Sequence, residues 1–322
     1  MYLSTIFFRF TIFYLHEKNL GYNPQEMTHQ AYIITGPTAS GKSDFAHILA
    51  HRTNGVIINC DSVQIYRGIE NISASPFANR PVSDTIDNIP YKLFSILPLT
   101  QQISVSDYLT LARHEYDLAI SDGKTPIFVG GTGYYINALI NGISPMPDIS
   151  DSSRNRARDM VAQDITNARK LLPPDFSATD PQRVARALEV YFETGHHLSE
   201  FQRIPRTGAV IPDAIRILIN PPADILRQRI SERIPQMLSG GAIDEAKSIL
   251  ESGWDERRAI GASQLCSHLR GEKTIDDCIT DWINKTNQYA KRQRTWFRTQ
   301  YNPDIVISHT PTQKDVLEII KK

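Results

Sequence analysis

The chain has 322 residues, of which 41% are hydrophobic and 22% charged, and its 35 basic side chains balance its 35 acidic ones. These proportions are typical of folded globular proteins and exclude disordered and fibrous classes. A net charge of zero provides no overall positive field, so any nucleic-acid surface has to be a local patch. The three cysteines, Cys60, Cys266 and Cys278, match neither a disulfide framework nor a zinc site, which predicts a protein of the reducing cytoplasm.

The first residues are apolar and aromatic from Leu3 to Leu15. Arg9 interrupts this stretch, and the stretch is too short to span a membrane. Met27 stands four residues before the first convincing strand. We therefore expect residues 1–30 to be an N-terminal extension outside the native core, and we expect no membrane segment.

The predicted elements begin with an apolar run, Ala31 to Thr35, followed by a glycine-rich loop and a helical pattern that ends before Gly55. A second strand of the buried type, Val56 to Cys60, leads into Asp61. Two such strands joined by a helix are expected to be parallel. Residues 71–100 are rich in Pro, Ser and Asn and predict an irregular segment.

A helix capped by Ser104 or Ser106 is expected next. A third strand, Pro126 to Val129, opens into Gly130-Gly-Thr-Gly133 and a short helix. Two later runs, Ile215 to Ile219 and Ile305 to Ile307, complete a predicted sheet of about five strands.

The segment between Pro145 and Pro212 shows no strand pattern. It contains two Arg-rich helical stretches, at about 151–172 and 182–194. Asp180-Pro181 and Gly195 are typical residues for the start and the end of the second helix. After the fourth strand the pattern is helical again, in three stretches: Ala223 to Leu238, Ala242 to Ser252 and Ile275 to Arg298.

These elements predict the α/β class, with a P-loop NTPase-like parallel sheet flanked by helices and a small all-helical insertion domain. The core is expected to comprise residues 31–144 and 213–322, including the C-terminal helices, and the insertion residues 145–212.

The strongest motif is a glycine-rich loop that fits G-x-x-x-x-G-K-[ST] and lies between a predicted strand and a predicted helix. Its backbone N–H groups can approach phosphate oxygens, and the helix N-terminus adds partial positive charge. Lys42 would pair with the outer phosphate, and the Ser43 hydroxyl would ligate Mg²⁺. The candidates for binding a diphosphate or a nucleotide such as ATP are Gly36, Pro37, Thr38, Ala39, Ser40, Gly41, Lys42 and Ser43.

A P-loop alone does not identify the reaction. An NTPase usually has a buried strand that ends in an acid, which holds Mg²⁺ while a water is activated. Here the third strand runs Ile127-Phe-Val-Gly130 and contains no acid, which disfavours phosphate hydrolysis. Asp61 instead follows the neighbouring strand, where the crevice of an open α/β sheet collects catalytic groups. A lone Asp in such a position is also a common turn or helix cap.

Five motifs follow one another along the chain: Gly36-Pro-Thr-Ala-Ser-Gly-Lys-Ser43, Asp61-Ser-Val-Gln-Ile-Tyr66, Val129-Gly-Gly-Thr-Gly-Tyr-Tyr135, Asp180-Pro-Gln-Arg-Val-Ala-Arg-Ala-Leu-Glu189 and Ala290-Lys-Arg-Gln-Arg-Thr-Trp-Phe-Arg298. In this order, from about residue 31 to 308, the chain resembles the bacterial type of tRNA dimethylallyltransferase. The resemblance implies Mg²⁺-dependent transfer of a dimethylallyl group from dimethylallyl diphosphate to a tRNA. The acceptor it implies is N6 of adenosine 37, beside the anticodon of tRNAs that read codons beginning with U, and the second product is diphosphate.

The resemblance also implies roles for individual residues. Asp61 matches the general base that takes the proton from the exocyclic amine. Thr38 and Thr132 match positions near the donor and the accepting adenine, and Arg233 matches an arginine close to the diphosphate. The catalytic candidates are thus Asp61, Thr132 and Arg233, and the implied tRNA-binding residues are Asp61, Ser62, Val63, Gln64, Thr132, Arg154, Gln182, Arg183, Val184, Ala185, Arg186 and Arg258. The expected partner is the tRNA anticodon stem-loop, bound by a monomer.

Basic islands interrupt the neutral chain at Arg154, Arg156 and Arg158, at Arg257 and Arg258, and at Lys291, Arg292, Arg294 and Arg298. Such islands could hold an anticodon loop while one adenine leaves its stack, although a charge run is also a common solvated face. Two segments depart from the family pattern. Pro90-Tyr-Lys-Leu93 stands where a Pro-His-His-Leu type is usual, and Ala262 stands where an aromatic residue is common.

Three other functions are compatible with parts of this pattern. A nucleotide or small-molecule kinase would share the P-loop and use Arg229 and Arg233 as lid arginines. A prenyltransferase acting on free adenine nucleotides would share the donor site without needing the Arg-bearing insertion. A non-catalytic RNA-binding protein on the same scaffold would bind tRNA with a strong salt dependence and no turnover.

Overall fold

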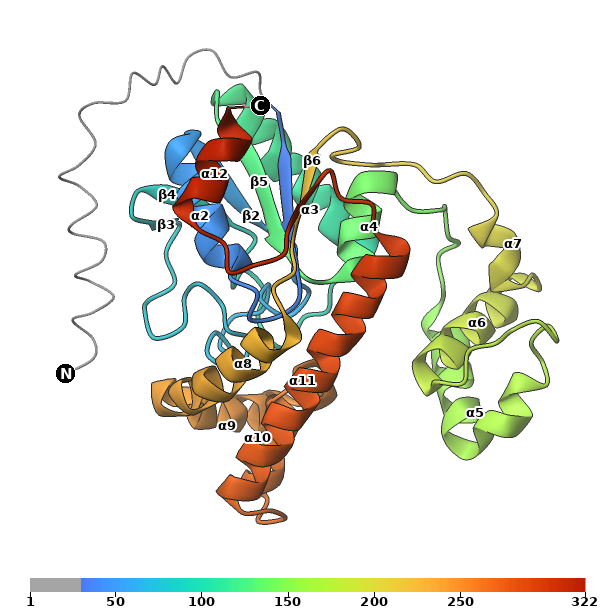
Figure 1. Cartoon of the computed structure of the whole chain (residues 1–322). Helices are drawn as coiled ribbons and strands as arrows, with labels where there is room; N and C mark the ends of the chain where they lie inside the picture. Colours follow the sequence, from blue (N-terminus) through green and yellow to red (C-terminus); the bar gives the residue numbers. More distant parts are fainter. Residues whose placement is uncertain (1–29, 322) are drawn as a thin grey trace, which may run out of the picture.

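The computed structural model describes residues 30–321 (Figure 1). The predicted N-terminal extension, residues 1–30, therefore lies outside the described residues except for Gln30. Within the described range, no helix has the length and apolar character needed to cross a membrane.

One seven-stranded sheet forms the centre of the molecule, in the strand order β3-β4-β2-β5-β1-β6-β7. The five predicted strands are present to within one residue at each end: β1 (Tyr32–Thr35), β2 (Gly55–Asn59), β5 (Thr125–Gly130), β6 (Ile215–Ile219) and β7 (Ile305–Ile307). They pair in parallel, as expected for strands joined by helical crossovers. The predicted α/β sheet is thus confirmed.

The prediction of an irregular segment over 71–100 is wrong in one place. Ile89–Lys92 forms β4, which pairs in parallel with β2, and Thr85–Ile86 forms β3, antiparallel to β4. Asp87 and Asn88 connect them with φ values of 52° and 64°, as in the type I′ turn of a two-residue hairpin. A hairpin this short, with a proline inside β4, carries little strand signal in the sequence.

Helices cover both faces of the sheet. On one face, α2 (Lys42–Arg52) and α12 (Gln313–Ile320) pack together over Tyr32 and Ile34 of β1. On the other face, α3 (Val105–Ser121) and α4 (Gly133–Asn141) cover Ile33. Alternate residues of one strand are therefore buried on opposite sides, as in a doubly covered parallel sheet. The predicted cap of α3 is Ser104, whose Oγ accepts from the backbone N–H of Asp107 at 3.1 Å.

The C-terminal third is largely helical, and its two longest helices, α8 (Ala223–Met237) and α11 (Ile275–Gln300), pack against each other. Figure 1 shows α11 running diagonally away from the end of the sheet, with the shorter helices at its lower end. The shorter elements are η3 (Leu238–Ala242), α9 (Ile243–Ser252), η4 (Glu256–Arg258) and α10 (Ala262–Leu269). The three predicted helical stretches are confirmed, whereas α10 and α12 were not predicted because each has only eight residues.

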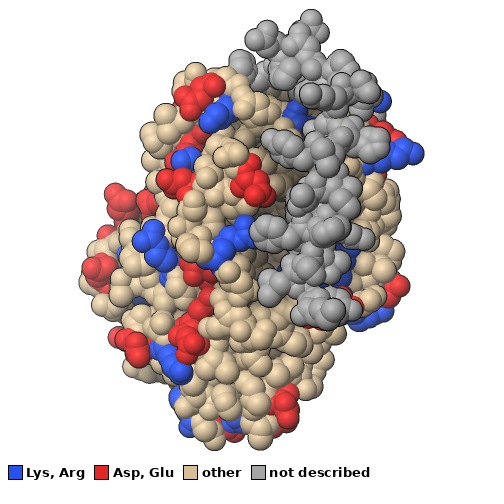
Figure 2. Space-filling view, turned by 90° about the vertical axis from the view of Figure 1, so that its left-hand side faces the viewer, with Lys and Arg blue, Asp and Glu red and all other residues tan. Residues whose placement is uncertain are grey.

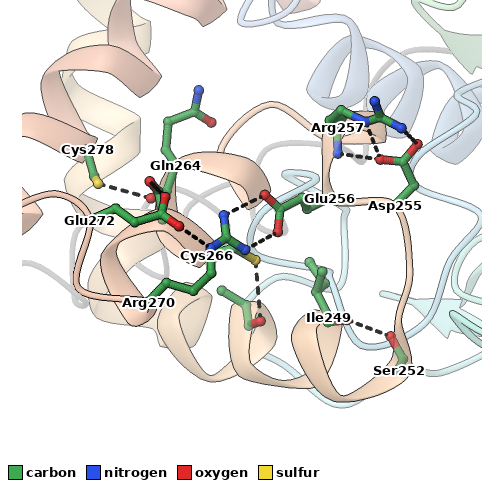
Figure 3. Close-up of polar contacts among 12 residues, drawn as sticks. Ile249, Ser252, Asp255, Glu256, Arg257, Gln264, Cys266, Arg270, Glu272 and Cys278 are labelled. Atoms are coloured by element: carbon green, nitrogen blue, oxygen red, sulfur yellow. Dashed lines mark hydrogen bonds and ion pairs between the residues drawn. The ribbon is translucent and has the colours of Figure 1, made fainter. Parts of the chain in front are cut away.

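Polar contacts connect the shorter elements of this helical region to one another (Figure 3). Arg270 donates to Glu256 of η4 at 2.8 Å and to Glu272 at 2.7 Å. Cys266 and Cys278 are buried free thiols that donate to backbone carbonyls. The prediction that the cysteines form no disulfide framework is confirmed, and no cluster of His, Cys, Asp or Glu in residues 30–321 could hold a metal ion.

The inserted segment contains α5 (Asp151–Arg169), α6 (Pro181–Thr194) and α7 (Leu198–Gln202), of which α7 was not predicted. Its helices enclose a separate hydrophobic cluster around Ala157 and Leu188. In Figure 1 it stands beside the core, reached by two non-helical connections. As predicted, Asp180 caps α6, accepting from the Arg183 N–H at 3.0 Å, and Gly195 ends the helix with a φ of 75°.

Candidate functional site

A cavity of about 890 Å³ opens beyond the carboxyl ends of β1 and β2, the edge at which open α/β sheets bind ligands. Three parts of the chain supply most of its polar wall: the P-loop after β1, the loop after β2, and the facing sides of α8 and α11. The residues used below are Thr38, Lys42, Ser43, Asp61, Ser62, Val63, Gln64, Arg229, Arg233, Arg258 and Gln293.

The P-loop has the geometry of a phosphate cradle. Gly41 precedes α2 with a φ of 92°, a value at which a side chain would be strained. The loop is closed by a hydrogen bond from Ser40 N to Pro37 O at 3.2 Å. Among the described residues, no side chain caps α2, so its first N–H groups and its dipole are available to an anion.

Two cationic side chains, Lys42 and Arg233, line the cavity near the P-loop. Burial lowers the pKa of Lys42 to about 8, although the nearby Asp61 opposes this effect and Arg233 adds to it. Burial likewise lowers the pKa of Arg233 to about 10. The Arg233 Nη2 donates to Thr38 Oγ1 at 2.9 Å, whereas its buried Nε has no partner among the described residues. A bound anion would stabilise both charged forms, so the site is suited to a diphosphate.

Asp61 lines the cavity near Lys42, and its backbone is held by a buried amide. Asn59, with 0% of its surface exposed, accepts from the Asp61 N–H at 2.8 Å and donates to the Asp61 carbonyl at 2.9 Å. The Asp61 Oδ1 accepts from the Val63 N–H at 2.9 Å. The carboxylate therefore has a fixed orientation, with lone pairs left for a ligand proton. Asn59 was not among the predicted site residues, because an Asn within a strand has no distinguishing pattern.

Thr132 does not line the cavity wall but lies directly behind it. Its Oγ1 accepts from the Ser62 N–H at 3.1 Å and contacts the Ser62 hydroxyl at 3.3 Å. Thr132 thus ties the 130–133 loop to the 61–64 loop. The structure brings Asp61 and Arg233 to the cavity, and Thr132 reaches it only through Ser62.

Two further residues contact the P-loop and were not in the predicted site. Arg229 donates to the carbonyls of Ala39 and Ser40, both at 3.2 Å, where the sequence offered it only as a kinase lid residue. Its position four residues before Arg233, on the same face of α8, is the signal that could have identified it. Gln293 of α11 accepts from the Thr38 N–H at 2.8 Å.

The predicted tRNA-binding residues fall into two groups. Ser62, Val63, Gln64 and Arg258 line the cavity, and Arg258 donates to the Tyr66 hydroxyl at 3.4 Å. Apart from Asp61 and Thr132, described above, the others lie on the insertion, where Arg154, Gln182 and Arg183 are exposed and Arg186 is half-buried.

Two exposed arginines of the insertion each pair with an acid three residues earlier in the chain. Arg154 pairs with Asp151 at 3.7 Å, and Arg183 pairs with Asp180 at 3.5 Å. Ion pairs at the surface contribute little stability, so phosphates could replace these acids at low cost.

The side chains of Val184 and Ala185, which are among the predicted tRNA-binding residues, are buried in the insertion. They are only 0% and 9% exposed, and they pack in the hydrophobic cluster of the insertion. Because a helix turns by 3.6 residues, the positions next to Arg183 and Arg186 include the buried face of α6. These two residues therefore stabilise the insertion.

The basic islands are mixed in character. Arg294 is a structural residue, because its Nε donates to Asn220 Oδ1 at 3.1 Å, and Arg156 stacks on Phe192 at 4.0 Å. Lys291, Arg292 and Arg298 of α11 are exposed. Figure 2 shows basic and acidic side chains interspersed on one face of the molecule, in agreement with the neutral net charge.

The sheet and its glycine-rich loop are those of P-loop enzymes. Because β5 ends in glycine and not in an acid, the site is suited to releasing a phosphorylated leaving group more than to activating water, and it defines a P-loop transferase.

Comparisons with known proteins identify the family. The model described as IPP transferase matches residues 64–300, and the model described as isopentenyl transferase matches residues 29–85. The tRNA dimethylallyltransferase of Rickettsia bellii is 34% identical over 302 residues, covering 90% of this chain and 94% of that protein. The one from Zymomonas mobilis is 39% identical over 284 residues, covering 84% and 88%. The chain therefore belongs to the IPP transferase family, the family of the tRNA dimethylallyltransferases.

Solved structures agree with this assignment. The tRNA isopentenylpyrophosphate transferase of Bacillus halodurans matches with a TM-score of 0.65 and 29% identity, covering 91% of this chain and 95% of that one. A eukaryotic dimethylallyltransferase acting on tRNA has the same fold, with a TM-score of 0.68 at 23% identity. The resemblance inferred from the five motifs is confirmed, and the kinase alternative has no support.

Proposed function

We propose that this protein transfers the dimethylallyl group of dimethylallyl diphosphate to N6 of adenosine 37, in tRNAs that read codons beginning with U. The products are N6-dimethylallyladenosine and diphosphate. The observation that carries the proposal is the presence, in one cavity, of the Asp61 carboxylate and the half-buried cations Lys42 and Arg233. An amine that attacks an allylic diphosphate needs a base at one end and anion stabilisation at the other.

In the proposed reaction, the N6 lone pair forms a bond to the allylic carbon while the bond from that carbon to the diphosphate oxygen breaks. Asp61 takes the proton that the amine loses. The negative charge that develops on the diphosphate is stabilised by Lys42, Arg233 and the N–H groups at the start of α2. No water needs to be activated, which agrees with the lack of an acid at the end of β5.

Mg²⁺ fits the oxygen donors of this site. Ser43 is exposed to the cavity at the start of α2, next to the phosphate cradle. Mg²⁺ is usually held by one or two protein oxygens, the substrate phosphates and water. Ser43 would be the protein ligand, and the bound ion would neutralise charge on the leaving diphosphate.

The acceptor is proposed to be the anticodon stem-loop of a tRNA, with its adenine drawn out of the stack into the cavity. The cavity-lining Arg258 and the exposed arginines of the insertion, residues 145–212, are the proposed phosphate contacts. We propose that a monomer in the cytoplasm carries out the reaction.

The test is to incubate the purified protein and Mg²⁺ with each donor, dimethylallyl diphosphate or ATP, and with each acceptor, tRNA or AMP. Diphosphate release that requires both the prenyl donor and tRNA is expected. Diphosphate release from the prenyl donor with AMP in place of tRNA would point to a nucleotide prenyltransferase. Phosphate transfer from ATP would point to a kinase. Either result would contradict the proposal.

A further inference from the structure

Gln293 connects two loops that the proposed reaction brings together. The residue is 6% exposed and lies in the C-terminal half of α11. The Oε1 accepts from the Thr38 N–H of the P-loop at 2.8 Å, and the Nε2 donates to the Gly131 carbonyl at 2.9 Å. Both ends of the amide are therefore used, each by a loop far away in the sequence.

The packing around Gln293 leaves it little freedom. A side chain at Gly131 would collide with the Gln293 Nε2, and one at Gly133 would collide with the ring of Trp296, one turn along α11. The glycines of the 130–133 loop thus let α11 approach the loop closely. A buried amide with two satisfied hydrogen bonds is a rigid connection, because breaking either bond leaves a buried polar group unpaired.

Further hydrogen bonds join these two loops to Arg233 and to the loop that carries Asp61. On the donor side, the Thr38 hydroxyl accepts from Arg233 at 2.9 Å. On the acceptor side, Thr132 follows Gly131 and its hydroxyl accepts from the Ser62 N–H, next to Asp61. Gln293 is the only described side chain that bonds both the P-loop and the 130–133 loop.

We propose that Gln293 is a positioning residue, which sets the distance between the donor diphosphate on the P-loop and the base Asp61. This inference rests on the proposed prenyl transfer. Gln293 contacts neither substrate in this account and acts through Thr38 and Gly131. A misplacement of about 1 Å between reacting groups can lower a rate by about a hundredfold, so losing this connection should slow the transfer itself more than it weakens binding.

The test uses three variants in single-turnover transfer assays with both substrates saturating. Gln293→Met keeps the length of the side chain and removes both hydrogen bonds. Gln293→Glu keeps the acceptor for the Thr38 N–H but cannot donate to Gly131 when ionised. Gln288→Met makes the same replacement at an exposed position of α11 and is the matched control. Thermal melts and tRNA dissociation constants are measured for every variant.

The transfer rate of Gln293→Met is expected to fall about tenfold to a hundredfold, with a tRNA dissociation constant within about twofold of that of the unsubstituted protein. Gln293→Glu, which places a carboxylate oxygen against the Gly131 carbonyl, should also slow the transfer, whereas Gln288→Met should change neither quantity. Gly131→Ala should break the same connection, so the double variant Gly131→Ala/Gln293→Met should lose little more than Gln293→Met alone.

The proposal is overturned if Gln293→Met transfers the prenyl group at nearly the original rate. It is also overturned if the decrease in rate is fully explained by weaker tRNA binding or by a smaller fraction of folded protein. A double variant whose fold-decrease in rate equals the product of the two single-variant decreases would also overturn it. If the unsubstituted protein itself shows no transfer, the proposed function fails and this inference fails with it. An active parent protein with an unaffected Gln293→Met variant contradicts the positioning role alone.

Discussion

Replacing Lys42 with methionine is expected to make the ligand-free protein more stable while removing donor use. Burial lowers the pKa of Lys42 from 10.5 to about 8, so the folded protein holds this charge at a cost. The pKa of Lys42 is lower in the folded protein than in the unfolded chain. The destabilisation caused by its charge is therefore fully present below pH 8 and is lost as the pH rises through 10.5. At about 1.4 kcal/mol per pKa unit, the cost is about 3 kcal/mol at pH 7 and about 1 kcal/mol at pH 10.

Urea denaturation at a series of pH values measures this difference. The free energy of unfolding of Lys42→Met minus that of the unsubstituted protein should decrease by about 2 kcal/mol from pH 7 to pH 10. Lys285→Met, at an exposed position on α11, is the control and should show no comparable trend. Pyrophosphate with Mg²⁺ should stabilise the unsubstituted protein and not Lys42→Met. A difference that is independent of pH would refute the reasoning that burial of this charge destabilises the free site.

Three further predictions concern single side chains. Asp61→Asn should lower the transfer rate by about 10²–10⁴ with unchanged tRNA affinity, and a rate near that of the parent protein would exclude Asp61 as the base. Arg233→Lys keeps the charge but loses the fork that reaches Thr38, so the KM for dimethylallyl diphosphate should rise about tenfold in steady-state assays. An unchanged KM would place the diphosphate elsewhere. Arg183→Ala should weaken tRNA binding and reduce the slope of log K against log salt by about 0.7–1, whereas an unaltered slope would mean that Arg183 makes no phosphate contact.

The parts of the site that are contiguous in the chain could be predicted from the sequence. The P-loop is one run of eight residues, and Asp61 directly follows a strand, so local patterns identify both. The contribution of Gln293 depends on its place on α11, and Gln293 itself is 255 residues away from Thr38 in the chain. No spacing rule predicts which side chain of a long helix will face a loop so far away.

In the insertion, the helical pattern separates the buried residues of a motif from the exposed ones. The resemblance assigned the whole run from Gln182 to Arg186 to tRNA, yet Val184 and Ala185 are buried. An apolar face through Val184 and Leu188 was already visible in the sequence at helical spacing. A motif marks a segment, and the helical period decides which of its residues can face a partner.

The most direct measurement is mass spectrometry of nucleosides from a tRNA anticodon stem-loop treated with this protein, dimethylallyl diphosphate and Mg²⁺. A parallel reaction uses a stem-loop with adenosine 37 replaced by guanosine. The account predicts N6-dimethylallyladenosine from the first stem-loop and none from the second. Equal modification of both stem-loops, or no modified adenosine in either, would contradict it.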